Sequence, residues 1–89
     1  MKYRIKLGRR ASSYLRRCEE DKKRALGVLI DQIALNPYNP DLSIPMQGEF
    51  EGTRRARLGS LRILFLVDDE VHIVDVTDIG PRGDVYKGR

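Results

Sequence analysis

The chain has 89 residues, of which 40% are hydrophobic, and a net charge of +4. This length supplies one hydrophobic core, so we expect a single domain over residues 1–89. No stretch is apolar enough for a membrane helix, the first residues lack the apolar region of a signal peptide, and Cys18, the single cysteine, excludes an intrachain disulfide and a cysteine-based zinc site. We therefore expect a cytoplasmic protein with no membrane partner.

The first third of the chain predicts one strand and two helices. Apolar and charged side chains alternate over residues 2–7, which is the period of a half-buried strand. From Ala11 to Cys18 the apolar side chains follow helical spacing, and a second apolar stripe runs from Leu26 to Ile33. The acidic residues 19–21 suit the first turn of that second helix, and Asn36-Pro37 ends it. The short connection predicts an antiparallel helical hairpin.

The rest of the chain predicts a loop followed by sheet. Residues 37–53 are rich in proline and glycine and are expected to form a loop. Strands are expected at 54–58, 61–67 and 71–79, with turns at 59–60, 68–70 and 80–84. The order is β-α-α-β-β-β, which predicts an α+β fold: an antiparallel sheet with the amphipathic helical hairpin packed on one face.

Alternation along the 54–65 hairpin predicts a face lined by arginines. A two-residue turn at Gly59-Ser60 sets Arg57 directly opposite Arg62, and Arg55 lies two residues along on the same face. The apolar side chains of the hairpin take the other face; they are Ala56, Leu58, Leu61, Ile63 and Phe65. Like charges that face each other destabilise a sheet. These arginines either extend into solvent or pair with Asp75, or they bind an anion, which is the interpretation that we favour.

The charge pattern favours a phosphodiester as that anion. Residues 25–53 contain no lysine or arginine, so all of the basic charge lies on either side of them, as is common in proteins with a polyanionic partner. Arginine presents a planar fork of donors that matches phosphate oxygens. Arg82 is a plausible fourth ligand, and Tyr86 either packs at the sheet end or acts chemically. His72 is expected to pack within a strand, and the acids show no metal-ligand spacing, so no metal or cofactor is expected.

These motifs resemble those of the RelE/ParE toxin superfamily. The run Arg55–Phe65 resembles the hairpin pattern R-x-R-x-G-x-Y-R-h-x-Y of that superfamily, and Met46–Gly48 resembles the L-x-G that precedes it. Ile79–Tyr86 resembles the closing I-x-x-R-x-x-h-Y, and Ile33–Pro37 resembles the L-x-x-N-P helix end. Each motif is weak alone, but the four occur in the right order and cover nearly the whole chain.

The resemblance implies the toxin of a type II toxin–antitoxin pair. RelE-like members cleave mRNA in the ribosomal A site without a metal and leave a 2′,3′-cyclic phosphate. The expected partners are therefore a RelB-like antitoxin, in a heteromeric complex, and the ribosome with its mRNA. By motif, the catalytic residues would be Arg62, Arg82 and Tyr86, and the RNA-binding residues would be Arg55 and Arg57.

The sequence departs from the family pattern at the hairpin. Leu61 and Phe65 stand where the family usually has tyrosine, although both are expected to face the core. Arg55 and Arg57 replace lysines of some members, and arginine, with a pKa above about 12, is a poor proton shuttle. Proton transfer would then rest on Tyr86. Two alternatives remain open: a ParE-like inhibitor of DNA gyrase, and an inactive relic that binds only its antitoxin and operator DNA.

Overall fold

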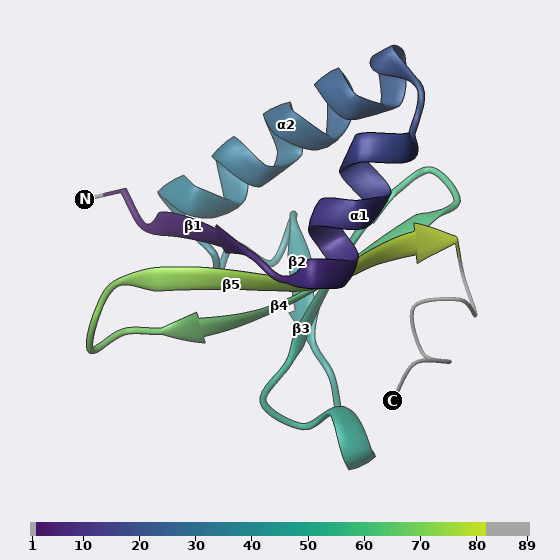
Figure 1. Ribbon diagram of the computed structural model, residues 1–89. Helices are drawn as coiled ribbons and strands as arrows, with labels where there is room; N and C mark the ends of the chain where they lie inside the picture. Colours follow the sequence, from purple (N-terminus) through teal and green to yellow (C-terminus); the bar gives the residue numbers. More distant parts are fainter. Residues whose placement is uncertain (1, 82–89) are drawn as a thin grey trace.

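The computed structural model describes residues 2–81, which form two layers (Figure 1). The elements in order are β1 (Arg4–Leu7), α1 (Arg9–Arg17), α2 (Glu20–Leu35), β2 (Ser43–Pro45), a 3-10 turn (Gly48–Phe50), β3 (Arg54–Leu58), β4 (Leu61–Asp68) and β5 (Ile73–Pro81). Over these residues the sheet has five strands in the order β1-β5-β4-β3-β2. The predicted α+β fold, with a helical hairpin on one face of a sheet, is confirmed.

The two helices carry the charges that their ends favour. Basic side chains, Arg16 and Arg17, occupy the last turn of α1, and acidic ones, Glu20 and Asp21, occupy the first turn of α2. Each such charge near a helix end is worth about 0.3–1 kcal/mol at an exposed site. α2 ends at Leu35, before Asn36-Pro37, as predicted. These charges therefore favour a helix end and a helix start on either side of the short connection. The apolar stripes pack the two helices against the sheet.

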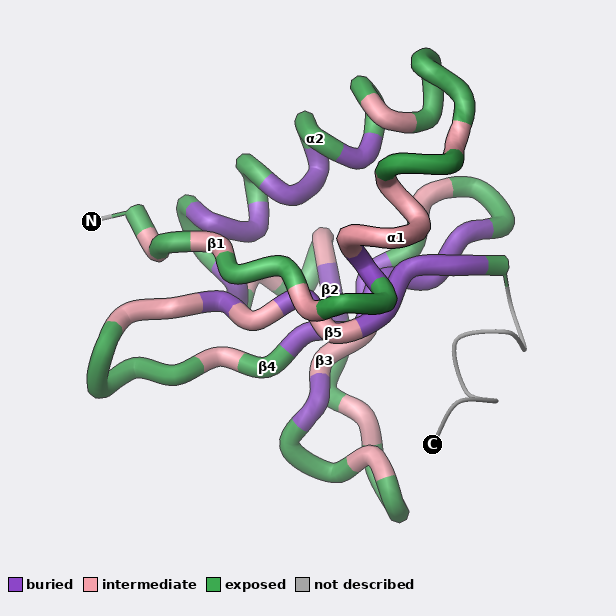
Figure 2. The backbone as a smooth tube through the Cα atoms, viewed as in Figure 1, coloured by how far each residue is buried: buried purple, intermediate pink, exposed green. Residues whose placement is uncertain are grey.

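The core lies between the helices and one face of the sheet, and Figure 2 shows the buried positions along the inner side of α2 and along β5. Leu26 and Ile33 from α2 are fully buried, as are Phe65 from β4 and Val74 and Val76 from β5. Burying a side chain of this size stabilises a fold by about 1.5–3 kcal/mol. This cluster of large side chains holds the two layers together.

The prediction of a purely antiparallel sheet is wrong, because β1 runs parallel to β5. Arg4 lies opposite Ile73 and Leu7 lies opposite Val76, while the other strand pairs are antiparallel. No hairpin turn joins β1 to β5, so their relative direction depends on how the whole intervening chain is folded. Alternation in the sequence predicts a strand, but it carries no information on the direction of its neighbour.

The loop predicted at residues 37–53 contains a strand, β2, which pairs with β3. Ser43 lies opposite Ala56, and Pro45 lies opposite Arg54. Proline is tolerated here because β2 is an edge strand, where a missing N–H group removes little from the ladder. The same prolines that favoured a loop in the sequence are therefore compatible with this short edge strand.

β5 begins and ends two residues later than predicted. The carboxylate of Asp68 accepts hydrogen bonds from the backbone N–H groups of Glu70 and Val71, at 3.0 and 3.4 Å, which extends the turn to residue 72. His72 is consequently a turn residue with a φ of 61°, not a strand residue. At the other end, Gly80 and Pro81 belong to β5 and not to a turn; residues 82–84 lie outside the described residues.

The turn between β4 and β5 is tied to the start of the chain by a polar cluster. The hydroxyls of Tyr3 and Tyr38 both donate to the carboxylate of Asp69, and the Tyr3 ring stacks on His72 with 3.7 Å between ring centroids. These hydrogen bonds, that of Tyr3 first, lower the pKa of Asp69. The same carboxylate raises the pKa of Tyr3 and raises that of Tyr38 to about 12. We call these four residues the Asp69 cluster.

Replacing Asp69 with asparagine should lower the pKa of Tyr38 from about 12 toward its ordinary value of 10.0, because the hydroxyl would lose its charged acceptor. Titration of tyrosinate absorbance in the near ultraviolet would measure this shift, with Tyr38→Phe identifying the step that belongs to Tyr38. An alkaline titration that is the same in wild type and Asp69→Asn would contradict the hydrogen bond.

The same cluster should make stability depend on pH at the acid end. The pKa of Asp69 is lowered on folding, so its contribution is present above the unfolded pKa and is lost as the pH falls through the folded one. Urea unfolding of the wild type should therefore show a loss of stability in this acid range that is smaller in Asp69→Asn. Equal losses in both proteins would assign the acid sensitivity to other carboxylates.

Candidate anion-binding site

The β3–β4 hairpin places three arginines on the sheet face that points away from the helices. Arg57 lies directly opposite Arg62, as predicted, and Gly59 in the connecting turn has the positive φ, 59°, that such turns require. Arg55 lies two residues from Arg57 and therefore shares its face. The intervening positions on the two strands, Ala56 and Ile63, are buried in the core on the helix side. We call Arg55, Arg57 and Arg62 the arginine face.

The three side chains differ in their exposure to solvent. Arg62, on the central strand β4, is only 7% exposed and lies opposite Gly80 of β5. Arg55 is half-buried and Arg57 is exposed. The arginine face therefore sets a buried arginine on the central strand β4 directly opposite an exposed one on β3, so that a single anion can reach both.

Arg55 and Arg57 have no partner for their charges in the part of the chain that the structure describes. Within residues 2–81, neither forms an ion pair or a side-chain hydrogen bond, and the Nε atom of Arg55 is buried without an acceptor. A buried donor left without an acceptor costs about 1–3 kcal/mol. Two adjacent cations, one of them with an unsatisfied buried donor, form a site to which an anion can supply the missing acceptors.

The neighbouring arginine, Arg54, contrasts with this pair because it is fully engaged in structure. Its Nε donates to the Ser43 hydroxyl at 2.8 Å, another nitrogen donates to the Ser43 carbonyl at 3.0 Å, and its guanidinium lies over the Tyr38 ring. Arg54 projects to the other side of β3 from Arg55 and joins β3 to β2. Arg54 is therefore a structural residue, which joins β3 to β2 and binds Tyr38.

The alternative that Arg62 pairs with Asp75 is wrong. Asp75 lies opposite Leu66, roughly 13 Å further along β4 than Arg62, and its neighbour in the β1–β5 register is Lys6. From the sequence, Asp75 was expected nearer to Arg62, because the predicted β4–β5 turn is shorter than the observed one. The irregularity in the β4–β5 register between Leu64 and Phe65 was also not expected. Asp75 therefore does not neutralise the arginine face.

The two departures from the toxin pattern lie on the core side of the sheet. Leu61 is 3% exposed and Phe65 is fully buried, and both belong to the core cluster, as predicted from the register. A tyrosine at either position would project from the face of the sheet opposite to that of Arg62. Their replacement by apolar residues therefore strengthens the core and removes no group from the arginine face.

Arg82 and Tyr86, the remaining candidate residues, lie outside the described residues, so their positions stay predictions. The last described residues, Gly80 and Pro81, lie opposite Arg62 and Leu61. Within residues 2–81, no three histidine, cysteine, aspartate or glutamate side chains gather closely enough to hold a metal ion. In the same part of the chain, no helix is long and apolar enough to span a membrane.

One feature of this region was missed by the sequence analysis. A hollow of about 210 Å³ lies beside the arginine face, between Arg55 and Arg57 and the segment of residues 40–44 that leads into β2. The sequence predicted only a loop for this segment, which includes the first residues of β2. The available signal was Asp41, one of only four acids in the stretch of residues 25–53 that has no basic residue.

Comparison with solved structures identifies the fold, although no family model and no curated sequence matches the chain. A chain of the toxin–antitoxin complex RelBE2 from Mycobacterium tuberculosis superimposes with a TM-score of 0.81 at 23% identity, over 92% of this chain and 100% of that one. An arginine double mutant of E. coli toxin RelE in the free state gives 0.79 at 21% identity, over 98% and 93%. A YoeB/ParE toxin from Agrobacterium tumefaciens gives 0.78 at 14% identity, over 89% and 98%.

The chain therefore has the fold of RelE-like toxins. Identities of 14–23% show the fold alone. What the chain does has to be argued from the arginine face.

Replacing Arg57 with alanine should stabilise the isolated protein by a few tenths to about 1 kcal/mol, because it removes the like charge opposite Arg62. It should also reduce the stabilisation that added inorganic phosphate confers, since a ligand that binds the native state alone shifts the unfolding midpoint. Urea unfolding in chloride and in phosphate of equal ionic strength measures both effects. Lys22→Ala, which removes an exposed cation from α2, is the matched control. An equal loss of the stabilisation by phosphate in both variants would mean that phosphate acts through general electrostatics and not at the arginine face.

Proposed function

We propose that this protein is the toxin of a type II toxin–antitoxin pair and acts as a ribosome-dependent, metal-independent endoribonuclease that cleaves mRNA and stops translation. The observation that supports this most directly is the arginine face, where Arg55 and Arg57, which have no partner among residues 2–81, adjoin the buried Arg62. The likeness of the fold to RelE toxins supplies the second line of support. A phosphodiester would provide the acceptors that the protein does not.

The proposed reaction is attack of an RNA 2′-hydroxyl on the adjacent phosphate. It needs a base for the hydroxyl proton, stabilisation of the charge on the pentavalent phosphate, and a group at the leaving oxygen. Arg62 is proposed to stabilise the pentavalent phosphate, because a guanidinium that is largely withheld from water interacts more strongly with charge. Arg55 and Arg57 hold the RNA backbone. Tyr86 takes the proton, and Arg82 lies against the leaving oxygen.

The ribosome has a physical role in this proposal. In-line attack requires the 2′-hydroxyl, the phosphorus and the leaving oxygen to be aligned, and such orientation can contribute several kcal/mol to a rate. The arginine face is open on its exposed side and offers charge more than shape, so it does not itself align a flexible RNA. The ribosomal A site supplies that alignment, and the isolated protein is expected to be a weak nuclease.

Replacing Arg62 with alanine, or Tyr86 with phenylalanine, should each abolish toxicity and A-site cleavage. Loss of one preorganised donor to a transition-state oxygen costs about 10²–10³ in rate. The measurement is cleavage of mRNA on programmed ribosomes, with growth of cells expressing each variant. Because Arg62 is buried, circular dichroism and thermal melting must show that each variant folds, and Arg62→Lys, which keeps the charge but loses the fork, serves as a milder second variant.

Cleavage by the wild type should continue in a slight excess of chelator, provided that the ribosomes remain intact. If both variants stay fully toxic while translation continues and DNA damage accumulates, the nuclease proposal is wrong. The alternative is then a ParE-like gyrase inhibitor, which the likeness to the YoeB/ParE toxin of Agrobacterium tumefaciens favours. If the wild type is itself harmless, the chain is a relic that only binds its antitoxin.

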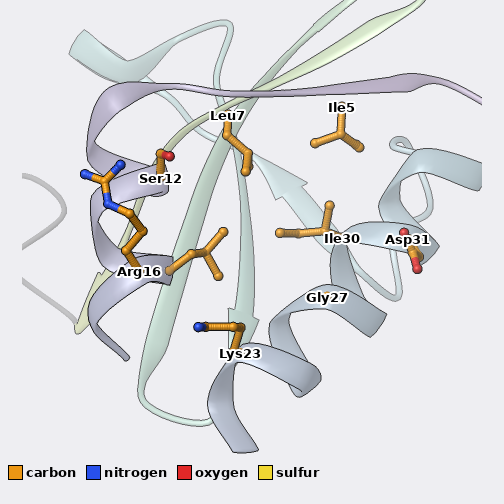
Figure 3. Close-up of a pocket in the computed structure, with 9 residues that line it drawn as sticks. Ile5, Leu7, Ser12, Arg16, Lys23, Gly27, Ile30 and Asp31 are labelled. Carbon is orange, nitrogen blue, oxygen red and sulfur yellow. The ribbon is translucent and has the colours of Figure 1, made fainter. Parts of the chain in front are cut away.

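The proposed protein partner is an antitoxin resembling RelB, since matching structures include toxin–antitoxin complexes of M. tuberculosis and E. coli. An apolar groove of about 490 Å³ between β1, α1 and α2 suits a segment of such a partner. Figure 3 shows Ile5, Leu7 and Ile30 within this groove, with Arg16 and Lys23 at its rim. A segment that folds on binding can cover the groove and reach the arginine face. The basic rim favours acidic side chains on the partner.

Introducing a charge into the groove should weaken the complex. Leu7, 41% exposed, contributes to the groove, and burying a leucine is worth about 1.5–3 kcal/mol, so Leu7→Glu should weaken binding by roughly 10-fold or more. Affinity for the protein encoded by the neighbouring reading frame, and its ability to neutralise toxicity, are the measurements. Val71→Glu, at an exposed apolar residue in the β4–β5 turn, is the control. Equal affinities of Leu7→Glu and wild type would place the partner elsewhere.

A further inference from the structure

The hollow beside the arginine face combines features that a phosphate site alone does not need. Its walls include the apolar side chains of Pro40, Leu42 and Ile44, and the last of these is 46% exposed. Arg55 and Arg57 form its inner wall. At about 210 Å³ it lies below the roughly 300–1,000 Å³ of clefts that enclose drug-sized ligands. Its size therefore fits one flat ring system attached to a group that continues outside it.

Among the residues that line the hollow is Asp41, an exposed residue whose carboxylate has no partner within the described part of the chain. Asp41 lies in the turn that leads into β2, two residues before Ser43, and lines the hollow together with Arg55 and Arg57. Within residues 2–81, the Asp41 side chain forms no ion pair and no hydrogen bond, although two arginines line the same hollow. The carboxylate and the guanidinium groups are thus both available to a ligand.

The segment that carries Asp41 is held in place by its own hydrogen bonds. The backbone N–H of Asp41 donates to the side-chain oxygen of Asn39 at 2.9 Å, and the N–H groups of Leu42 and Ser43 donate to the Asn39 carbonyl at 3.0 and 3.2 Å. Arg54 then binds Ser43 through both its hydroxyl and its carbonyl. A site whose groups are already ordered loses less free energy on binding a ligand.

We propose that this hollow is a nucleobase subsite and that Asp41 is its specificity-determining residue. This inference rests on the proposed function, because the base must belong to an RNA whose phosphate occupies the arginine face. Single-stranded RNA bases are bound in proteins by stacking on arginine planes or apolar surfaces and by hydrogen bonds to their polar edges. Arg55, Arg57 and the apolar wall supply surfaces on which a base can stack. Asp41 supplies hydrogen-bond acceptors for the edge of the base.

The chemistry of a carboxylate indicates which base is selected. An ionised carboxylate only accepts hydrogen bonds, and its two oxygens are best matched by two adjacent donors. Guanine presents such a pair, a ring N–H beside an amino group. Adenine and cytosine present an amino group beside an acceptor, and uracil presents one N–H between two carbonyls. The subsite should therefore prefer guanine and discriminate most strongly against uracil.

The test compares base preference in the wild type, Asp41→Asn and Glu70→Gln. Glu70→Gln removes the same charge from the exposed β4–β5 turn, at the opposite end of β4 from Arg62, and is the matched control. The first measurement is the affinity for short single-stranded RNAs of uridine that carry one guanosine, adenosine or cytidine. The second is sequencing of the 5′ ends of mRNA that each protein cleaves on ribosomes.

The wild type and Glu70→Gln should favour the guanosine RNA over the all-uridine RNA by about 10-fold, the discrimination typical of one bidentate contact. Asp41→Asn should lose most of that ratio, because an amide offers one donor and one acceptor, and Asp41→Glu should restore part of it. An Asp41→Asn protein that cleaves with an unchanged base profile would overturn the subsite while leaving the nuclease intact. Absence of any mRNA cleavage by the wild type would overturn the proposed function and the subsite with it.

Discussion

The arrangement of this protein depends on the register of the β3–β4 hairpin, which fixes Arg57 against Arg62. Side chains alternate strictly along a strand, so a slip of one residue would exchange every side chain of β3 between the two faces. Such a slip would turn Arg55 and Arg57 toward the helices and expose Ala56 and its apolar neighbours. The two-residue turn at Gly59-Ser60 prevents this, since Gly59 adopts a positive φ that most residues avoid.

The free energies of the two faces explain how the β3–β4 hairpin folds despite its arginines. Opposed like charges cost a few tenths to about 1 kcal/mol on a sheet, and the buried Nε of Arg55 adds a further cost of about 1–3 kcal/mol. On the other face, Leu61, Ile63 and Phe65 are each worth about 1.5–3 kcal/mol when buried. Burial of the core face therefore stabilises the fold, whereas the arginines on the other face lower its stability. Binding of an anion would explain why the arginines occupy this face.

The sequence predicted what depends on neighbouring residues and missed what depends on distant ones. Both helices, the β3–β4 register and the two faces of the hairpin follow from local periodicity and one tight turn. The direction of β1, the pairing of β2 and the Asp69 cluster all depend on contacts between segments far apart, such as Tyr3 with Asp69. Asp41 was missed for the same reason, since its proximity to Arg57 exists only once β2 pairs with β3.

These distant contacts also explain why the segment before β2 can hold a recognition residue. Tyr38, at its start, is anchored to Asp69, and Ser43, at its end, is anchored by Arg54, which also lies over the Tyr38 ring. The segment between them is therefore fixed to both the β4–β5 turn and β3, and it cannot move without breaking contacts to the sheet. By contrast, the side chains of Arg55 and Arg57 have no ion pair or hydrogen bond to residues 2–81 that would hold them. In the proposed site, the rigid segment selects the base, the arginines adjust to the phosphate, and the ribosome provides the alignment that neither of them supplies.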